Sequence, residues 1–192
     1  MNLNISISEV TQPDVLLLDS INSLLSSLSP NAPAITNDVL RELIEDPATR
    51  LLLATINTPS AKEGSSESEV VGGEGSSESD TVDKGKVTSK DRKKIVGMLT
   101  LAVFRIPSGV RAWIEDVVVD TEMRGNGIGA ALVRRAIEIA QESKAKTVDL
   151  TSRPSREAAN RLYQRLGFEQ RSTNVYRYTV ENDAPPYRDQ RN

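Results

Sequence analysis

Hydrophobic and polar residues alternate along this chain with two periodicities, and these predict an ordered series of strands and helices. Period-two or continuous apolar runs bounded by polar turns predict strands at residues 3–8, 50–57, 93–106, 110–120, 146–152, 168–171 and 174–180. Apolar residues at helical spacing predict helices over residues 13–28, 36–46, 127–144 and 155–166. Strands on both sides of helices indicate an α/β (α+β) fold, in which a mixed sheet carries helices on its faces.

Capping residues and apolar stripes set the expected limits and orientation of the helices. Thr11 is an N-cap candidate for the first helix, and Thr36 or Asn37 is a candidate for the second. The helix at 127–144 carries an apolar stripe that is expected to face the sheet. This stripe consists of Ile128, Leu132, Ala136 and Ile139.

Residues 59–92 depart from this pattern because they are rich in Ser, Gly and Glu and almost free of large apolar side chains. Such a segment cannot bury enough surface to offset the entropy lost on ordering, so we expect a disordered, low-complexity insertion. The alternative is a phosphorylated or partner-binding arm. Residues 181–192 are expected to form a flexible tail. The remainder is expected to form a single domain within residues 1–180.

The amino-acid composition excludes several kinds of catalytic and metal-binding site. The chain of 192 residues contains no cysteine and no histidine, which excludes disulfides, thiolate zinc sites and a cysteine nucleophile. A general base must therefore be Asp, Glu, Lys, Tyr or a water that they hold, and no metal is expected. A net charge of −3 argues against a nucleic-acid partner. No apolar run reaches 18 residues and no basic leader is present, so we expect a cytoplasmic protein without a membrane partner, with the nucleus as the alternative compartment.

A glycine cluster between a predicted strand and a predicted helix, "MRGNGIGA" at residues 123–130, is typical of a phosphate-binding turn. As G-x-G-x-x-A it fits a dinucleotide fingerprint, with Asp149 as the acid that would bind a ribose. Against this interpretation, the polar linker "DTEMR" separates strand from glycines. In addition, only about 60 residues follow, and a three-stranded meander precedes the turn instead of a βαβ unit.

The turn also fits R-x-x-G-x-G/A through Arg124, Gly127 and Gly129, and there it resembles motif A of the GNAT superfamily of N-acetyltransferases. A second signature of that family, A-x-x-L-Y-x-x-x-G-F, is matched downstream by Ala159, Leu162, Tyr163, Gly167 and Phe168. The order of predicted elements is also that of the family. The resemblance implies a mostly antiparallel sheet of six to seven strands, splayed between the fourth and the fifth.

The resemblance further implies that acetyl-CoA is the co-substrate and that its pyrophosphate lies on the turn. Successive backbone N–H groups and the positive end of the following helix can bind one anion there, and glycines allow a close approach. The strand before the turn can pair its main chain with the pantetheine amides. The expected cofactor-binding residues are Val117, Val118, Val119, Arg124, Gly125, Asn126, Gly127, Ile128, Gly129, Ala130 and Tyr163.

For catalysis, the family match implies that Tyr163 protonates the leaving thiolate, although a packed core tyrosine would also fit the pattern. Glu115 and Asp116 are adjacent carboxylates before an apolar strand, and alternation places them on opposite faces. We expect Glu115 to accept the amine proton through water, with bulk water as the alternative base. Trp113 lies two residues away on the same face, where an aromatic ring beside a carboxylate suits a cationic amine. The expected substrate-side residues are thus Trp113, Glu115 and Asp116.

The chain departs from the family at one position. Where the second motif often carries an asparagine that contacts CoA, seven residues before the tyrosine, this sequence has Arg156. The expected function is transfer of an acetyl group to a primary amine, on a small molecule more readily than on a peptide or protein. A non-catalytic CoA-binding module is a third hypothesis, and a homodimer is left open as the oligomeric state.

Overall fold

The computed structural model describes residues 4–29, 33–58 and 92–180, and within them it places strands and helices in the predicted order. The expected insertion falls almost entirely on residues 59–91, which lie outside the described residues, as does the expected tail at 181–192. The elements are β1 (Ile5–Glu9), α1 (Val15–Leu28), α2 (Asn37–Glu45), β2 (Thr49–Thr58), β3 (Arg92–Ile106), β4 (Gly109–Val119), the 3-10 helix η1 (Thr121–Met123), α3 (Ile128–Glu142), β5 (Ala145–Leu150) and α4 (Glu157–Arg165).

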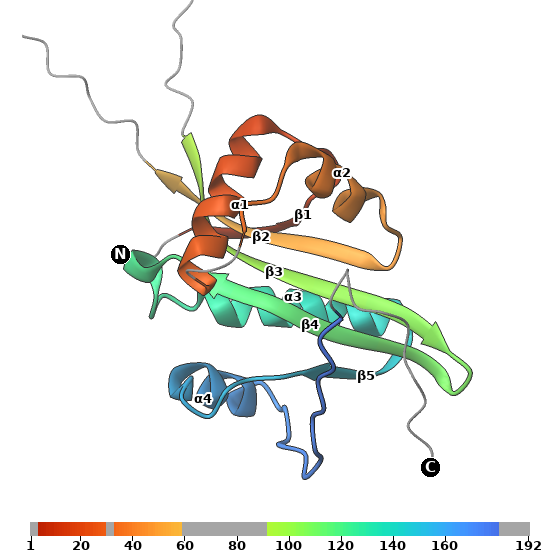
Figure 1. The fold of residues 1–192 in the computed structure, drawn as a ribbon. Coiled ribbons are helices and arrows are strands. Elements are labelled where there is room, and N and C mark those ends of the chain that lie inside the picture. Colours follow the sequence, from red (N-terminus) through yellow and green to blue (C-terminus); the bar gives the residue numbers. More distant parts are fainter. Residues whose placement is uncertain (1–3, 30–32, 59–91, 181–192) are drawn as a thin grey trace, which may run out of the picture.

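One sheet joins the five strands in the order β1-β2-β3-β4-β5 (Figure 1). The first four strands pair antiparallel, because short connections such as the turn between β3 and β4 return the chain beside itself. β5 pairs parallel with β4, because the 15-residue helix α3 carries the chain back to the starting edge. The mixed, mostly antiparallel sheet is therefore confirmed.

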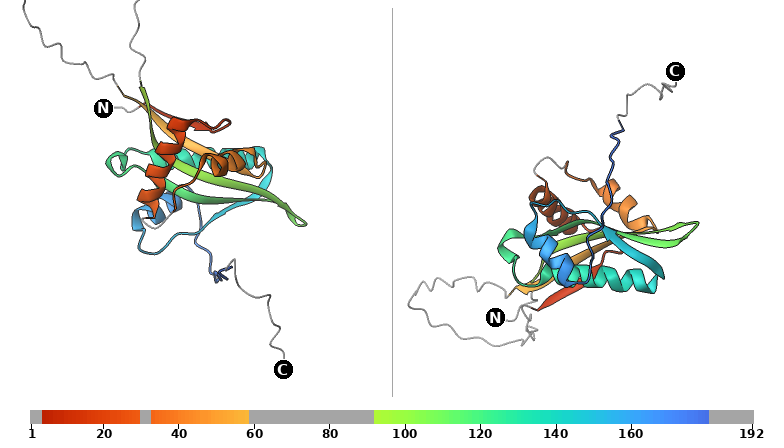
Figure 2. Two further views of the ribbon diagram at one scale, coloured as in Figure 1. Left: turned by 45° about the horizontal axis from the view of Figure 1, so that its top comes forward. Right: turned by 90° about the horizontal axis from the view of Figure 1, so that it is seen from below.

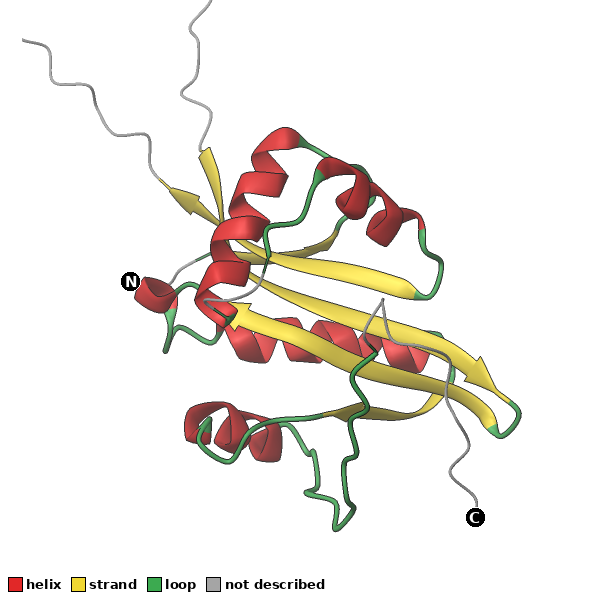
Figure 3. Ribbon diagram, in the orientation of Figure 1, coloured by secondary structure: helices red, strands yellow, loops and turns green. Residues whose placement is uncertain are grey.

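Helices cover both faces of the sheet, as predicted (Figures 2 and 3). On one face, α1 and α2 pack against β2 and β3 through a cluster that includes Ile21, Leu40 and Leu53. On the other face, α3 packs through a larger cluster, and all four residues of its predicted stripe are buried there. The side chain of Thr36 accepts a hydrogen bond from the Val39 N–H and caps α2, whereas α1 begins directly after Asp14 and not at Thr11.

The sheet opens between β4 and β5, where the candidate functional site lies. The pairing of these strands ends at Ile114 with Leu150, although β4 continues to Val119. The last part of β4 therefore has β3 on one side and no strand on the other within the described residues. The splay between the fourth and fifth strands is as expected.

The expected number of strands is wrong, because the described sheet has five strands and not six or seven. Residues 168–171 and 174–180 follow α4 without joining a ladder. Their composition favours a strand, but such a preference takes effect only when a neighbouring strand supplies backbone and side-chain partners. In the described parts of the chain, no helix is long and apolar enough to cross a membrane.

Candidate functional site

A groove of about 980 Å³ lies where β4 and β5 separate, and it gathers elements that are distant in the sequence. The end of β4 and the glycine turn form one side, the first turns of α4 form the other, and the end of α1 contributes a further wall. Most of the predicted cofactor-binding residues line it, with Asn126 as the exception. The lining includes Ser27, Leu28, Val117, Val118, Val119, Met123, Arg124, Gly125, Gly127, Ile128, Gly129, Ala130, Arg156, Arg161, Leu162, Tyr163 and Arg165.

The glycine turn reaches its shape through backbone angles that only glycine adopts freely. Gly125 and Gly127 have φ values of 82° and 80°, and Gly127 is the N-cap of α3. A Cβ at either position would meet no atom within 4 Å, so both face open space. Gly129 differs, since a Cβ there would lie 3.3 Å from Leu162 and would press α3 against α4. Two glycines thus shape the turn and the third permits close packing.

Side-chain hydrogen bonds hold the turn in place. The Asn126 amide donates to the carbonyl oxygens of Met123 at 3.1 Å and of Arg124 at 3.3 Å. The Arg124 Nε donates to the carbonyl oxygen of Val119 at 3.4 Å, which ties the turn to the end of β4. With these carbonyls engaged and α3 beginning at Ile128, the N–H groups of the turn and the positive helix end have the arrangement that binds an anion in other proteins. Asn126 therefore shapes the turn and does not line the groove.

The open edge of β4 offers main-chain groups to a ligand. The Asp120 N–H donates to the carbonyl of Val96 on β3 at 2.9 Å. Because successive amides of a strand alternate in direction, the Val119 N–H points away from β3 and towards the opening. The Val119 N–H is therefore placed to donate to a ligand in the opening.

Four arginines line the groove, namely Arg124, Arg156, Arg161 and Arg165, and they give it a basic character in a chain of net charge −3. Arg161 also forms an ion pair with Glu157 at 3.2 Å, which leaves an excess of positive charge. Of these, only Arg124 and Arg156 stand at positions of the two family motifs. The four-residue spacing of Arg161 and Arg165 was the available signal, because it places both on one face of α4.

Tyr163 is the only described residue that lines both this groove and a second cavity along β5. Its ring packs edge-on against Phe168, with centroids 5.9 Å apart, so the second signature also stabilises the end of α4. Burial raises the pKa of the Tyr163 phenol, and the nearby Arg156 opposes that shift. The phenol is therefore protonated at neutral pH, as a proton donor must be. Arg156 lines the same groove as Tyr163.

Trp113 and Glu115 lie together on the face of β4 opposite α3. The Trp113 Nε1 donates a hydrogen bond of 2.7 Å to Glu115 Oε1. This bond engages one carboxylate oxygen of Glu115, which is an exposed residue. The predicted pairing of an aromatic ring with a carboxylate on one strand face is therefore present.

Asp116 does not follow the simple alternation that the sequence suggests. The register between β3 and β4 shifts between Met98 and Thr100, so that Asp116 and Val117 lie opposite a single residue of β3. Asp116 adopts the left-handed conformation, with φ of 51°, as bulge residues often do. Partial burial of its carboxyl group raises the pKa of Asp116, and the negative charge of the neighbouring Glu115 raises this pKa further.

The raised pKa of Asp116 predicts a pH-dependent stability effect. A carboxyl group whose pKa is higher in the folded than in the unfolded state lowers the free energy of unfolding once it ionises. This loss is absent at a pH below the unfolded-state pKa, and it develops as the pH rises from there through the folded-state pKa. We expect Asp116→Asn to raise Tm at neutral pH by roughly 1–3 °C. At pH below the ordinary carboxyl pKa of 3.8 the gain should disappear.

Thermal unfolding of both proteins across this pH range checks the Asp116 prediction, because asparagine also tolerates a positive φ and preserves the bulge. Asp38→Asn, at an exposed position on α2 where aspartate pairs with Arg41, is the control and should give no such gain. An equal gain at acid and neutral pH would contradict the electrostatic origin.

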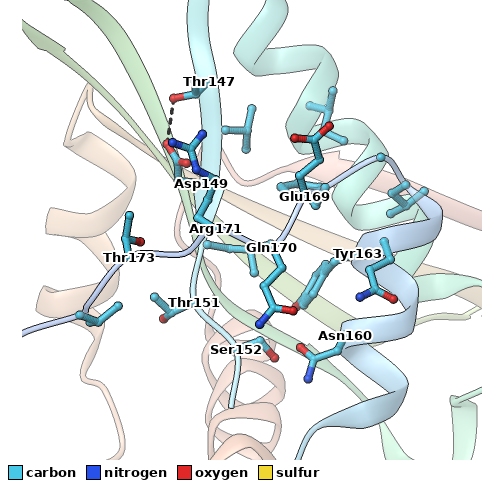
Figure 4. Close-up of a pocket in the computed structure, with 18 of the residues that line it drawn as sticks. Thr147, Asp149, Thr151, Ser152, Asn160, Tyr163, Glu169, Gln170, Arg171 and Thr173 are labelled. Carbon is cyan, nitrogen blue, oxygen red and sulfur yellow. Dashed lines mark hydrogen bonds between the residues drawn. The ribbon is translucent and has the colours of Figure 1, made fainter. Parts of the chain in front are cut away.

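The second cavity, of about 840 Å³, runs along the open edge of β5 (Figure 4). Side chains of β5, α4, residues 169–171, Thr173 and Val175 line it, and Thr147 donates a hydrogen bond of 2.8 Å to Asp149 within it. Asn160 lines this cavity and donates to the carbonyl of Arg153, so it does not replace the asparagine that the family motif places elsewhere. Asp149 is absent from the groove of the glycine turn, which counts against the dinucleotide interpretation. In the described segments, no cluster of three or more His, Cys, Asp or Glu residues could hold a metal ion.

The chain matches the family model described as "Acetyltransferase (GNAT) family" over residues 67–168, more than half of its length. It is 40% identical over 60 residues to an uncharacterized N-acetyltransferase of Methanocaldococcus jannaschii, covering 31% of this chain and 26% of that protein. It is 38% identical over 65 residues to a probable glucosamine 6-phosphate N-acetyltransferase of Oryza sativa, covering 34% and 37%. An N-alpha-acetyltransferase of Arabidopsis thaliana is 36% identical over 85 residues, covering 44% of each chain. The chain thus spans less than half the length of these curated relatives.

Solved structures share the fold at low sequence identity. An aminoglycoside acetyltransferase from an uncultured soil metagenomic sample, in complex with sisomicin, superposes with a TM-score of 0.65 at 16% identity, covering 92% of this chain and 97% of that one. An aminoglycoside N-acetyltransferase in complex with CoA superposes with a TM-score of 0.63 at 12% identity, covering 93% and 97%. At these identities the likeness extends to the fold alone.

Proposed function

Because the chain belongs to the acetyltransferase (GNAT) family, we propose that it transfers the acetyl group of acetyl-CoA directly to a primary amine of a small molecule. The main observation in support of the proposal is the groove that lies where β4 and β5 separate. It combines an open strand edge, an anion-binding turn and four arginines around Tyr163. These are the features that a long thioester with phosphate groups at one end requires.

Acetyl-CoA would be held by the chain in two parts. The N–H groups of residues 124–130 and the start of α3 would bind the pyrophosphate, and the groove arginines would add charge-assisted hydrogen bonds to phosphate oxygens. The open edge of β4 would pair with the pantetheine amides, as an added strand does. The Val119 N–H, which points to this edge, would stabilise the carbonyl oxygen as it becomes an oxyanion.

The transfer forms a C–N bond and breaks the C–S bond of the thioester. The ammonium nitrogen loses two protons, one before it attacks and one as the amide forms, and the second of these restores the group that protonates the leaving sulfur. An alkyl ammonium with a pKa of about 10.4 has to lose a proton before it can attack. Glu115 would accept this proton, directly or through a water, with its carboxylate oriented by Trp113. Tyr163, protonated at neutral pH, would donate a proton to the leaving thiolate sulfur. The absence of cysteine favours direct transfer in a ternary complex over an acetyl-enzyme intermediate.

The two candidate acceptor classes have separate support. A small amine is favoured by the exposed Trp113–Glu115 pair, which presents an aromatic ring beside a carboxylate. The rice relative and the aminoglycoside enzymes bear names of small-molecule acetyltransferases. The Arabidopsis relative is named an N-alpha-acetyltransferase, and this makes a peptide N-terminus the second candidate.

An acceptor screen tests the proposal. Purified protein is mixed with acetyl-CoA and with panels of primary amines and of peptides, and product is followed by mass spectrometry and CoA release. We expect acetylation of one or more amines in the small-molecule panel. Acetylation confined to peptides would favour the second candidate, and CoA binding without any transfer would favour a non-catalytic module.

Glu115→Gln is expected to lower kcat at neutral pH by about 10²-fold, the usual scale of a general base. The loss should shrink as pH rises, because the amine then deprotonates in water and no longer needs the carboxylate. The measurement is the pH profile of kcat with an amine from the screen. Glu138→Gln, at an exposed position on α3, is the matched control and should leave the profile unchanged. A profile of Glu115→Gln parallel to that of the wild type would exclude Glu115 as the base.

A further inference from the structure

Most of the polar side chains that line the cavity along β5 bear a hydroxyl or an amide group (Figure 4). Such groups both donate and accept hydrogen bonds, so they suit a ligand that does the same. The cavity volume of about 840 Å³ lies in the range of small-molecule sites, which is roughly 300–1,000 Å³. The hydroxyl- and amide-bearing side chains include Thr147, Thr151, Ser152, Asn160, Gln170 and Thr173.

The Ser152 hydroxyl in this cavity makes no hydrogen bond to the protein. Its oxygen is buried, and among the described residues no donor or acceptor is within hydrogen-bond distance of it. A buried hydroxyl without a partner destabilises a fold, so such a group in a cavity usually serves a ligand or a water. Asn160 donates from its amide nitrogen to the carbonyls of Arg153 and Pro154, at 3.0 and 3.4 Å, which leaves its side-chain oxygen as an acceptor. Ser152 and Asn160 can thus offer a donor and an acceptor to one ligand.

The cavity also carries apolar surface and an excess of negative charge. Leu150 and Phe168 are among the apolar side chains that line it, and such surface packs against the carbon skeleton of a ligand. Two carboxylates, Asp149 and Glu169, line it together with one guanidinium, that of Arg171, so the charged lining favours a cation. A carbon ring that bears hydroxyl groups and an ammonium group matches all of these properties.

The cavity adjoins the groups proposed to act in acetyl transfer. Tyr163 lines both this cavity and the groove of the glycine turn. Asp149 is the β5 partner of Trp113 in the register of β4 and β5, and paired residues of adjacent strands point to the same face of a sheet. Trp113 in turn donates its hydrogen bond of 2.7 Å to Glu115. A ligand in the cavity therefore lies next to the proposed acid and next to the pair that includes the proposed base.

We propose that the cavity along β5 binds the acceptor, and that this acceptor is an amine that carries several hydroxyl groups, such as an amino sugar. The proposal rests on the proposed acetyl transfer and narrows its substrate class. Ser152 is then a specificity-determining residue, because a hydroxyl of the ligand supplies the partner that the Ser152 hydroxyl lacks in the protein. An amine with a bare hydrocarbon skeleton leaves Ser152 and Asn160 unpaired, and sites built to bind a hydroxyl discriminate strongly against ligands without one.

Binding of hydroxylated amines tests the proposal directly. Isotope-labelled protein saturated with CoA is titrated with glucosamine, with kanamycin and with cyclohexylamine, which has a six-membered ring and an amine but no hydroxyl. We expect at least one of the two hydroxylated amines to bind at least about 10-fold more tightly than cyclohexylamine and to shift the amides of residues 147–152 and 169–173.

Equal or weaker binding of both hydroxylated amines, or shifts confined to other residues, would overturn the proposal. Because binding is measured without turnover, its failure is distinct from a failure of acetyl transfer. Acetylation of cyclohexylamine alone would refute the substrate class and leave the proposed acetyl transfer intact.

Ser152→Ala separates ligand binding from a structural role. The variant should weaken binding of the hydroxylated amine by about 10-fold and leave the affinity for cyclohexylamine unchanged. It should also keep the wild-type Kd for CoA, because Ser152 does not line the groove of the glycine turn. Its Tm should equal or exceed that of the wild type, since a buried hydroxyl without a partner is removed.

Ser26→Ala is the matched control for Ser152→Ala. Ser26 is exposed on α1, where its hydroxyl donates to the carbonyl of Ser23 at 2.7 Å, and its loss should change none of these affinities. Unchanged binding of the hydroxylated amine to Ser152→Ala, or a lower Tm with an equal loss of affinity for every ligand, would contradict the role of Ser152.

Discussion

Gly127→Glu is expected to reduce CoA affinity by more than about 100-fold. The substitution places a carboxylate at the N-cap of α3, where the N–H groups would bind pyrophosphate, so it adds like charge and fills the site. Hydrogen bonds to charged groups contribute about 1.5–3 kcal/mol each, and loss of two of them is enough for this effect. Isothermal titration calorimetry with CoA measures the change.

The geometry of Gly127 separates a binding defect from a folding defect. A Cβ at this position meets no atom within 4 Å, so the first side-chain atom clashes with no part of the described structure. The remaining cost is the φ of 80°, which is about 1–2 kcal/mol for a residue other than glycine. Gly127→Ala carries the same backbone cost without charge or bulk, and it should retain most of the affinity that Gly127→Glu loses. Unchanged CoA affinity in the glutamate variant would disprove the pyrophosphate cradle.

Tyr163→Phe should lower kcat by about 10²-fold while leaving the KM for acetyl-CoA nearly unchanged. The phenol is expected to act on the leaving thiolate, which develops only as the C–S bond breaks, so its loss affects the transition state more than binding. Phenylalanine keeps the edge-on contact with Phe168, and the end of α4 should therefore stay in place. Steady-state kinetics with an amine identified by the screen provides the measurement.

A tyrosine outside the groove provides the control for this experiment. Tyr178 is 83% exposed, and Tyr178→Phe removes a hydroxyl without removing the aromatic ring. Its kcat should equal that of the wild type. A kcat for Tyr163→Phe within a few-fold of the wild type would assign Tyr163 to packing, which is the alternative that the sequence left open.

The parts of the fold that could be predicted are those set by residues close together in the sequence. The stripe of α3 and the Thr36 cap of α2 depend on residues three and four apart, and both are present. The glycine turn could be predicted in the same way, because a positive φ at Gly125 and Gly127 needs no distant partner. These local predictions hold, whereas the Thr11 cap does not, because α1 begins at Val15.

Features that depend on distant partners were not predictable in the same way. Residues 174–180 have the composition of a strand, yet pairing requires an edge that the sequence cannot place. The bulge at Asp116 depends on the register with β3, so counting along β4 alone gave the wrong alternation. The approach of Arg156 to Tyr163 and the contribution of Ser27 to the groove arise only once α4 and α1 are packed.

The groove between β4 and β5 is proposed to hold CoA by the glycine turn and the open strand edge. Nuclear magnetic resonance of isotope-labelled protein titrated with CoA tests it most directly. The largest amide shifts are expected at residues 117–119 and 124–130, and equal amounts of NAD⁺ should leave these amides unchanged. Shifts of the glycine turn with NAD⁺ but not with CoA, or CoA-induced shifts confined to other parts of the protein, would contradict the account.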